Sequence, residues 1–178
     1  MMLKTFRTTH GFGIHSPFAF EMATSVLRGK TNYYDLEELN ARSDVSGRTR
    51  SIGRLLFKLA VRFRPCEMLI FGDDNNYFEE VARLALLNLG EEKSRLKVFF
   101  FSGEAGGDAS WRRFVENIGG THEYIAVMLL SNKRKVRKYF IRHFTENLPV
   151  GMTFLARNRL MVVAALRHLP RQNYKMRF

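Results

Sequence analysis

Residues Met68–Asn76 read MLIFGDDNN, an apolar run followed by one glycine, two carboxylates and two amides. The apolar run is typical of a buried strand, and a helical pattern begins at Tyr77. A strand, a glycine and a helix in this order form the place where α/β folds bind phosphates and nucleosides. This loop has a single glycine, however, and Asp73 and Asp74 would repel an anion. The stretch therefore predicts the architecture more firmly than it predicts a ligand.

Strands and helices alternate along the rest of the chain. In chain order the expected elements are strand 67–71, helix 77–89, strand 96–101, helix 108–118, strand 124–130, helix 132–147, strand 151–156, helix 158–169 and strand 173–178. This order predicts a Rossmann-like α/β fold, which is a mostly parallel sheet with helices on both faces. Helices that connect parallel strands are expected to cross right-handedly.

Three helical segments are expected before the first strand. The first begins at Ser16-Pro17, where the serine caps the helix and proline is tolerated at the first position. A shorter helix over 36–42 and a polar loop over 43–50 follow. Ser51 is expected to cap a longer helix that ends before Pro65.

This longer helix is amphipathic. Its cationic face is expected to be exposed, and consists of Arg54, Lys58 and Arg62. Its apolar stripe is expected to be buried, and consists of Ile52, Leu55, Leu56, Leu59 and Phe63.

Composition sets the class of protein. The 178 residues suffice for one domain, so we expect a single domain with a helical extension (1–65) and an α/β core (66–178). Lys plus Arg number 29 and Asp plus Glu 17, which gives a net charge of +12 that attracts polyanions. The single cysteine, Cys66, excludes an intrachain disulfide and is expected to be a buried structural thiol. With neither a signal peptide nor a membrane span expected, the chain is predicted to be cytoplasmic, without a membrane partner.

Several segments resemble a known family. They are similar to the N-terminal half of a group of bacterial class I S-adenosylmethionine-dependent methyltransferases, which carry a similar HSPF opening and a GRLLFRL helix before the first strand. The segments are GFGIHSPFAF (11–20), Tyr33-Tyr34 and GRLLFKL (53–59) leading into Arg64-Pro65, with YKMRF (174–178) at the end. The resemblance implies a cofactor site at the carboxyl ends of the strands.

The first strand and its loop match that site in part. Gly72 matches the first glycine of the family loop. The acid expected two positions earlier corresponds to Ile70, and the next glycine falls near Asn76. The remnant of the cofactor loop is therefore Gly72, Asp73, Asp74 and Asn76.

The other strand ends depart further from the family. The carboxylate that grips the two ribose hydroxyls corresponds to Ser102, and Glu104 is the only acid nearby. The aspartate expected after the third strand corresponds to Leu129 or Leu130. The one or two aspartates expected after the fourth correspond to Ala156-Arg157.

Losses at four positions indicate a decayed site. Serine is a poor substitute for a carboxylate that accepts two hydrogen bonds, and leucine in place of aspartate removes metal ligation and general-base chemistry. The resemblance thus implies a pseudoenzyme without a cofactor, acting as a binding or partner subunit with a protein partner or as a homo-oligomer. One alternative is an active methyltransferase that binds S-adenosylmethionine in an unusual site. Another is a basic nucleic-acid-binding module.

Acidic residues and histidines are the remaining candidates for chemistry. Asp73 and Asp74 on one loop, with Glu104 and Asp108 on the next, form either an acidic cluster or solvated loops, and solvated loops are the commoner case. The histidines lack metal-ligand spacing, so we assign no catalytic or metal residue.

The strongest surface signal is cationic and opens the helix expected at 132–147. Arg134, Lys138 and Arg142 are spaced four apart and share a helix face, and Lys133 precedes them. Cations at a helix N-terminus oppose the helix dipole. We interpret these four residues as candidates for binding an anion such as nucleic acid.

Overall fold

The computed structural model describes residues 16–27, 33–42, 44–72, 76–91, 93–102, 109–148, 150–156 and 159–176. The strands in these ranges are β1 (Glu67–Gly72), β2 (Lys97–Ser102), β3 (Tyr124–Leu129), β4 (Met152–Ala156), β5 (Leu160–Ala165) and β6 (Gln172–Met176). The helices are α1 (Pro17–Glu21), η1 (Met22–Val26), α2 (Tyr34–Asn40), α3 (Gly47–Phe63), α4 (Asn76–Asn88), α5 (Ala109–Gly119) and α6 (Arg134–Asn147). Most expected elements are confirmed within two or three residues.

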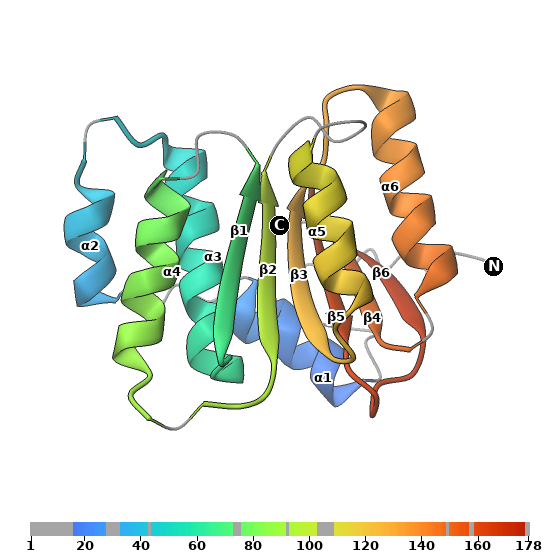
Figure 1. Cartoon of the computed structure of the whole chain (residues 1–178), viewed down its shortest axis with the longest axis horizontal. Helices are drawn as coiled ribbons and strands as arrows, with labels where there is room; N and C mark the ends of the chain where they lie inside the picture. The colour runs from blue at the N-terminus through green and yellow to red at the C-terminus, as the bar shows by residue number, and fades with distance from the viewer. Residues whose placement is uncertain are drawn as a thin grey trace.

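The strands form one mixed sheet in the order β1-β2-β3-β5-β4-β6 (Figure 1). β1, β2 and β3 pair in parallel, as do β4 and β6, whereas β5 is antiparallel to both of its neighbours. All strands except β5 therefore point the same way. The predicted α/β class, with a mostly parallel sheet and helices on both faces, is confirmed.

The helix expected over 158–169 is wrong, because this segment contains β5. The sequence of β5 is LMVVAA, and it lies between β3 and β4, buried on both faces. A strand inserted between two others is favoured by β-branched residues such as Val162 and Val163. Long-range pairing, which a local helical pattern does not report, decides the state of this segment.

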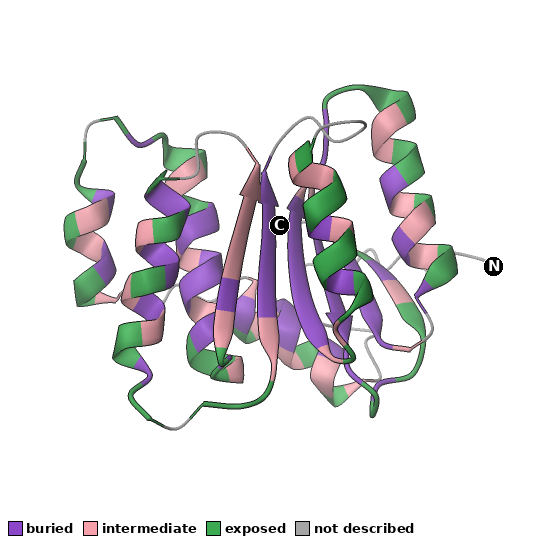
Figure 2. Ribbon diagram, in the orientation of Figure 1, coloured by how far each residue is buried: buried purple, intermediate pink, exposed green. Residues whose placement is uncertain are grey.

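Helices cover both faces of the sheet. Figure 1 shows α3 and α4 on one side and α5 and α6 on the other. The side chains of β2 alternate accordingly: Val98 and Phe100 pack in the cluster that includes α3 and α4, whereas Phe99 and Phe101 pack against Phe114 of α5. Figure 2 shows the resulting layers: β2, β3 and β5 are largely buried, β1 is largely half-buried, and the helices are exposed on their outer faces.

The connections β1–α4–β2 and β2–α5–β3 step in the same direction across the sheet. Because α4 and α5 lie on opposite faces, the two crossovers have opposite hands. The prediction that every crossover is right-handed is therefore wrong for one of them. As a result, the chain leaves the carboxyl ends of the adjacent strands β1 and β2 toward opposite faces.

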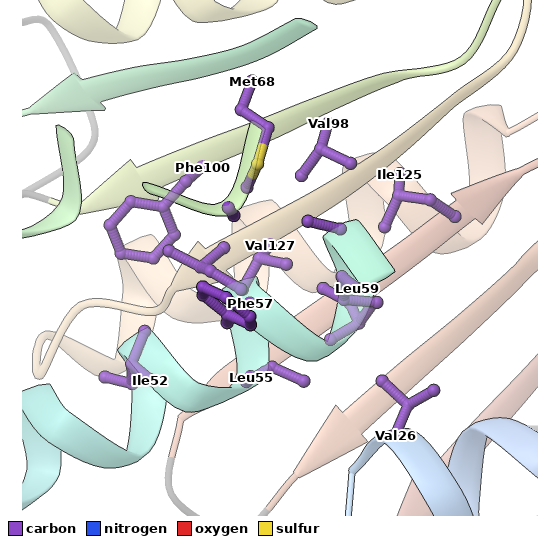
Figure 3. Packing of buried hydrophobic residues seen from close by; sticks show 14 of the residues in the cluster. Val26, Ile52, Leu55, Phe57, Leu59, Met68, Val98, Phe100, Ile125 and Val127 are labelled. Atoms are coloured by element: carbon purple, nitrogen blue, oxygen red, sulfur yellow. The ribbon is translucent and has the colours of Figure 1, made fainter. Parts of the chain in front are cut away.

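The helical extension packs on one face of the sheet and shares its core. Ser16 caps α1 as expected, and its Oγ accepts a hydrogen bond from the Ala19 amide at 3.3 Å. Ser46, not Ser51, caps α3, because its Oγ accepts from the Thr49 amide at 3.1 Å and the helix starts at Gly47. Figure 3 shows buried side chains of α3, among them Phe57 and Leu59, in one cluster with Val127 and Ile125 of β3.

The two faces of α3 agree with the expectation only in part. Ile52, Leu55, Leu56 and Leu59 are buried, as predicted. Phe63 is half-buried rather than buried, and Arg54 and Lys58 are half-buried rather than exposed. Burial lowers the pKa of Lys58, with a further contribution from the Arg54 charge. Arg62 is exposed, as predicted, and pairs with Glu21 at 2.5 Å.

Cys66 is exposed, so the prediction of a buried thiol is wrong. It lies just before β1, at the amino edge of the sheet and outside the stacked layers. Its Sγ donates a hydrogen bond to the carbonyl oxygen of Leu96 at 3.3 Å.

Tyr124 is expected to make stability depend on pH above 10. Burial raises the pKa of Tyr124 to about 12, so the folded chain keeps a proton that the unfolded chain loses between pH 10 and 12. The stabilisation is fully present below pH 10 and is lost as the pH rises, by about 1.4 kcal/mol for each pH unit in this window. Urea denaturation at pH 9 and pH 11 should show a smaller loss for Tyr124→Phe than for the wild type. Tyr139→Phe, which removes a hydroxyl from an exposed position, is the control. Equal losses in wild type and Tyr124→Phe would contradict the expectation.

Candidate functional site

The carboxyl ends of β1, β2 and β3 meet at one edge of the sheet, where α4 and α6 begin. Open α/β sheets bind their ligands outside this edge, where neighbouring connections diverge to opposite faces. The connections after β1 and β2 diverge in this way. The edge is therefore the candidate site.

Gly72 and Ser102 bring the ends of β1 and β2 close together. They are direct register partners, and Gly72 has a φ of 117°, which side chains rarely tolerate. A Cβ on Gly72 would lie 1.4 Å from the carbonyl oxygen of Ser102. The glycine that matches the family loop thus has a packing reason to be a glycine, independent of any cofactor.

The positions that correspond to the family's acids are mostly covered by the protein. Ser102 and Ala156 are buried, and Ile70 and Leu129 are half-buried against the core cluster on the α3 side. Leu130 is buried as well.

Asp73, Asp74, Glu104 and Asp108 lie outside the described residues, as does Arg157. Asn76 is the exposed first residue of α4. Within the described part of the chain, no three His, Cys, Asp or Glu side chains gather where they would hold a metal ion.

A hollow of about 280 Å³ lies at this edge, on the α3 side of the sheet. Its walls come from the first turns of α3, from Phe78 of α4, and from residues 129–132, which are the last residue of β3 and the three that follow it. Ile52, Phe78 and Leu129 give it an apolar lining, and Arg48 supplies a cation. Sequence reasoning missed this hollow because it placed residues 43–50 in a loop.

The cationic start of α6 lies at the same edge. Lys133, Arg134 and Lys138 are exposed, as predicted. Arg142 is also exposed, but its Nε donates to Glu146 at 2.8 Å, and this hydrogen bond raises the pKa of Arg142. The structure therefore brings Arg134, Lys138 and Arg142 onto one exposed face, with Arg142 already partnered.

Ser131 joins the hollow to this helix. Its side chain is buried, and its Oγ accepts a hydrogen bond from the Lys133 amide at 3.1 Å. The half-buried Arg137 donates from Nη1 to the Ser131 carbonyl oxygen at 3.5 Å. Ser131, which lines the hollow together with Arg48, is thus hydrogen-bonded to the start of α6 through Lys133 and Arg137.

No protein-family model, curated protein or solved structure matches this chain. Among the described helices, none combines the length and the apolar character needed to cross a membrane. The assignment of a function therefore rests on the chemistry of the carboxyl edge.

Proposed function

We propose that this chain is a methyltransferase-like pseudoenzyme that works as a binding or partner subunit. The observation that carries the proposal is the chemistry of the strand ends: β1, β2, β3 and β4 finish at Gly72, Ser102, Leu129 and Ala156. None of these described strand-end residues is a carboxylate. A cofactor with two ribose hydroxyls and a cationic sulfonium needs acceptors and negative charge at this edge.

The covering of these positions supports the same proposal. A buried Ser102 and Ala156 present little polar surface to a ligand, and Leu129 is part of the lining of the hollow. The hollow, with Arg48 at its wall, fits an apolar or anionic group better than a cationic one. A partner's side chain is the ligand that this proposal assigns to it.

S-adenosylmethionine is expected not to bind. Isothermal titration calorimetry with S-adenosylmethionine and with its demethylated product should show no saturable heat, which corresponds to a dissociation constant weaker than about 1 mM. A dissociation constant in the micromolar range would contradict the pseudoenzyme proposal and support the active-methyltransferase alternative. In that case Thr49→Trp, which fills the hollow, would show whether the cofactor occupies it.

A second candidate function is binding of nucleic acid through α6. The specific observation in its favour is the exposed cationic face at the start of this helix, beside the candidate site. The charge reversals argued in the Discussion test this candidate separately from cofactor binding.

A further inference from the structure

The outer surface of α6 carries an exposed aromatic ring as well as cations. Tyr139 lies near the middle of the helix and is 60% exposed. Phe140 and Phe144 are buried and attach the helix to the core cluster on this side of the sheet. The packing of α6 therefore does not require a ring at position 139, and Tyr139 is available to a ligand.

Neighbouring rings hold the Tyr139 ring in place. His143, one turn later, stacks on it with 24° between the ring planes and 6.0 Å between the centroids. His143 is itself fixed, because its Nδ1 accepts a hydrogen bond from Asn147 Nδ2 at 3.3 Å and its ring meets Phe144 edge-on. Phe140 meets the Tyr139 ring edge-on at 5.7 Å. With His143 on one side of the tyrosine ring, the opposite face is open to a planar group.

Three exposed cations surround this ring. Lys135 is four residues before Tyr139 and Arg142 is three residues after it, so both lie beside it on the helix surface. Lys138 is its neighbour in sequence and is also exposed. Glu146 is the only carboxylate in the sequence of α6, and it pairs with Arg142. The open ring face therefore lies within a cationic surface.

A second exposed tyrosine has the opposite electrostatic surroundings. Tyr34 is 96% exposed at the start of α2, at the other end of the molecule from α6 (Figure 1). The acidic residues Asp35, Glu37 and Glu38 follow it. A polyanion would be repelled at Tyr34 and attracted at Tyr139. Charge thus distinguishes the two exposed rings and favours a negatively charged ligand at α6.

The ring and the cations together specify the ligand. An aromatic face stacks on a nucleobase, and lysine and arginine neutralise the phosphates that link the nucleosides. A duplex offers the phosphates but keeps its bases stacked on one another in its interior. The carboxylates of an acidic protein offer negative charge but no planar group. A single strand offers phosphates and open base faces at the same time.

We propose that the Tyr139 platform, which consists of the Tyr139–His143 ring pair with Lys135, Lys138 and Arg142, binds single-stranded nucleic acid. A base lies on the open face of the tyrosine ring, and the cations hold the phosphates on either side of that base. Every base has a face that can stack, so binding is expected to tolerate any sequence. This site rests on the second candidate function, binding of nucleic acid through α6, and adds the form of nucleic acid that the helix takes.

Fluorescence anisotropy of the full chain at low salt tests the proposal. The labelled probes are single-stranded oligo(dT), the same sugar–phosphate strand without bases, and a duplex, each about 12 nucleotides long. The first two probes carry the same charge, so the difference between them measures the contribution of the bases. Oligo(dT) should bind about 5–150-fold more tightly than the abasic strand, which is the range that one stacked base provides. Equal affinities for these two strands, or no binding of oligo(dT), would overturn the proposal.

Tyr139→Ala locates the stacked base. This variant should lose the preference for oligo(dT) over the abasic strand and keep the wild-type affinity for the duplex, which also shows that it is folded. Tyr139→Phe keeps the ring and should keep the preference. Tyr34→Ala removes the exposed ring in acidic surroundings and should bind all three probes as the wild type does.

A wild-type preference for oligo(dT) in Tyr139→Ala would overturn the proposal. Loss of duplex affinity in Tyr139→Ala to the same extent as loss of oligo(dT) affinity would overturn it as well, because stacking does not contribute to duplex binding. The second candidate function fails on a different measurement, which is equal duplex binding by the wild type and by the variant that reverses the charges of α6.

Discussion

Replacing Leu56 by alanine is expected to lower the free energy of unfolding by about 2–5 kcal/mol. Leu56 is fully buried on α3, in the cluster that joins the helical extension to the sheet. Removing its side chain loses the transfer free energy of the buried carbons and leaves a cavity that close packing prevents from collapsing fully. The midpoint and slope of urea denaturation at pH 7 measure the change.

The control is Leu87→Ala on α4. Leu87 is 67% exposed, so the same chemical change there is expected to alter the free energy of unfolding by less than about 0.5 kcal/mol. If Leu56→Ala changes it by well under 1 kcal/mol, α3 is peripheral and the extension does not share the core. A second unfolding transition in Leu56→Ala would lead to the same conclusion.

Local patterns predicted most of this fold. The apolar stripe of α3 and the uninterrupted apolar run VFFF at 98–101 were sufficient, because each segment has one state that buries its apolar residues. The cap of α3 was misplaced because Ser46 and Ser51 both precede apolar residues at helical spacing. Only the hydrogen bond to the Thr49 amide distinguishes them.

The errors arose where distant segments decide the outcome. The apolar residues of β5 suit a helix or a strand. Backbone pairing with β3 on one side and with β4 on the other favours the strand. The hand of a crossover depends on which face receives the helix. The faces of α4 and α5 are set by packing with α3 and α6, which a local pattern does not contain.

In the candidate site, too, local features could be predicted from the sequence and long-range ones could not. Gly72 was found from the sequence, because a glycine after a strand is a local signal. The role of its hydrogen, which allows the approach to Ser102, required the pairing of strands separated by 30 positions. The buried hydrogen bond from Tyr77 to Asn40 had no sequence signal, because the two residues are 37 positions apart and neither belongs to a binding motif.

The cationic face of α6 can be tested by reversing its charges, and the structure shows which of them are already paired. Arg134 and Lys138 are exposed, and Arg142 forms an ion pair with Glu146. Replacing all three by Glu is expected to leave the fold intact, since exposed charges contribute little to stability. Position 142 loses its ion pair with Glu146 and gains a like-charge contact with it, and each of these two changes costs only about 0.2–0.5 kcal/mol.

If this face binds nucleic acid, the wild type should bind duplex DNA with an affinity that falls steeply with salt. Each neutralised phosphate contributes about −0.9 to the slope of log affinity against log salt, so three contacts account for about −2.7 of the wild-type slope. Fluorescence anisotropy at several salt concentrations measures both quantities, and the triple variant should lose binding at low salt. The control changes the same charge at the amino edge of the sheet, with Glu in place of the exposed Lys93, Arg95 and Arg167. Equal binding by the wild type and the α6 variant would mean that this helix is a solvated face. An acidic protein partner would then be the best remaining explanation for the net charge of +12.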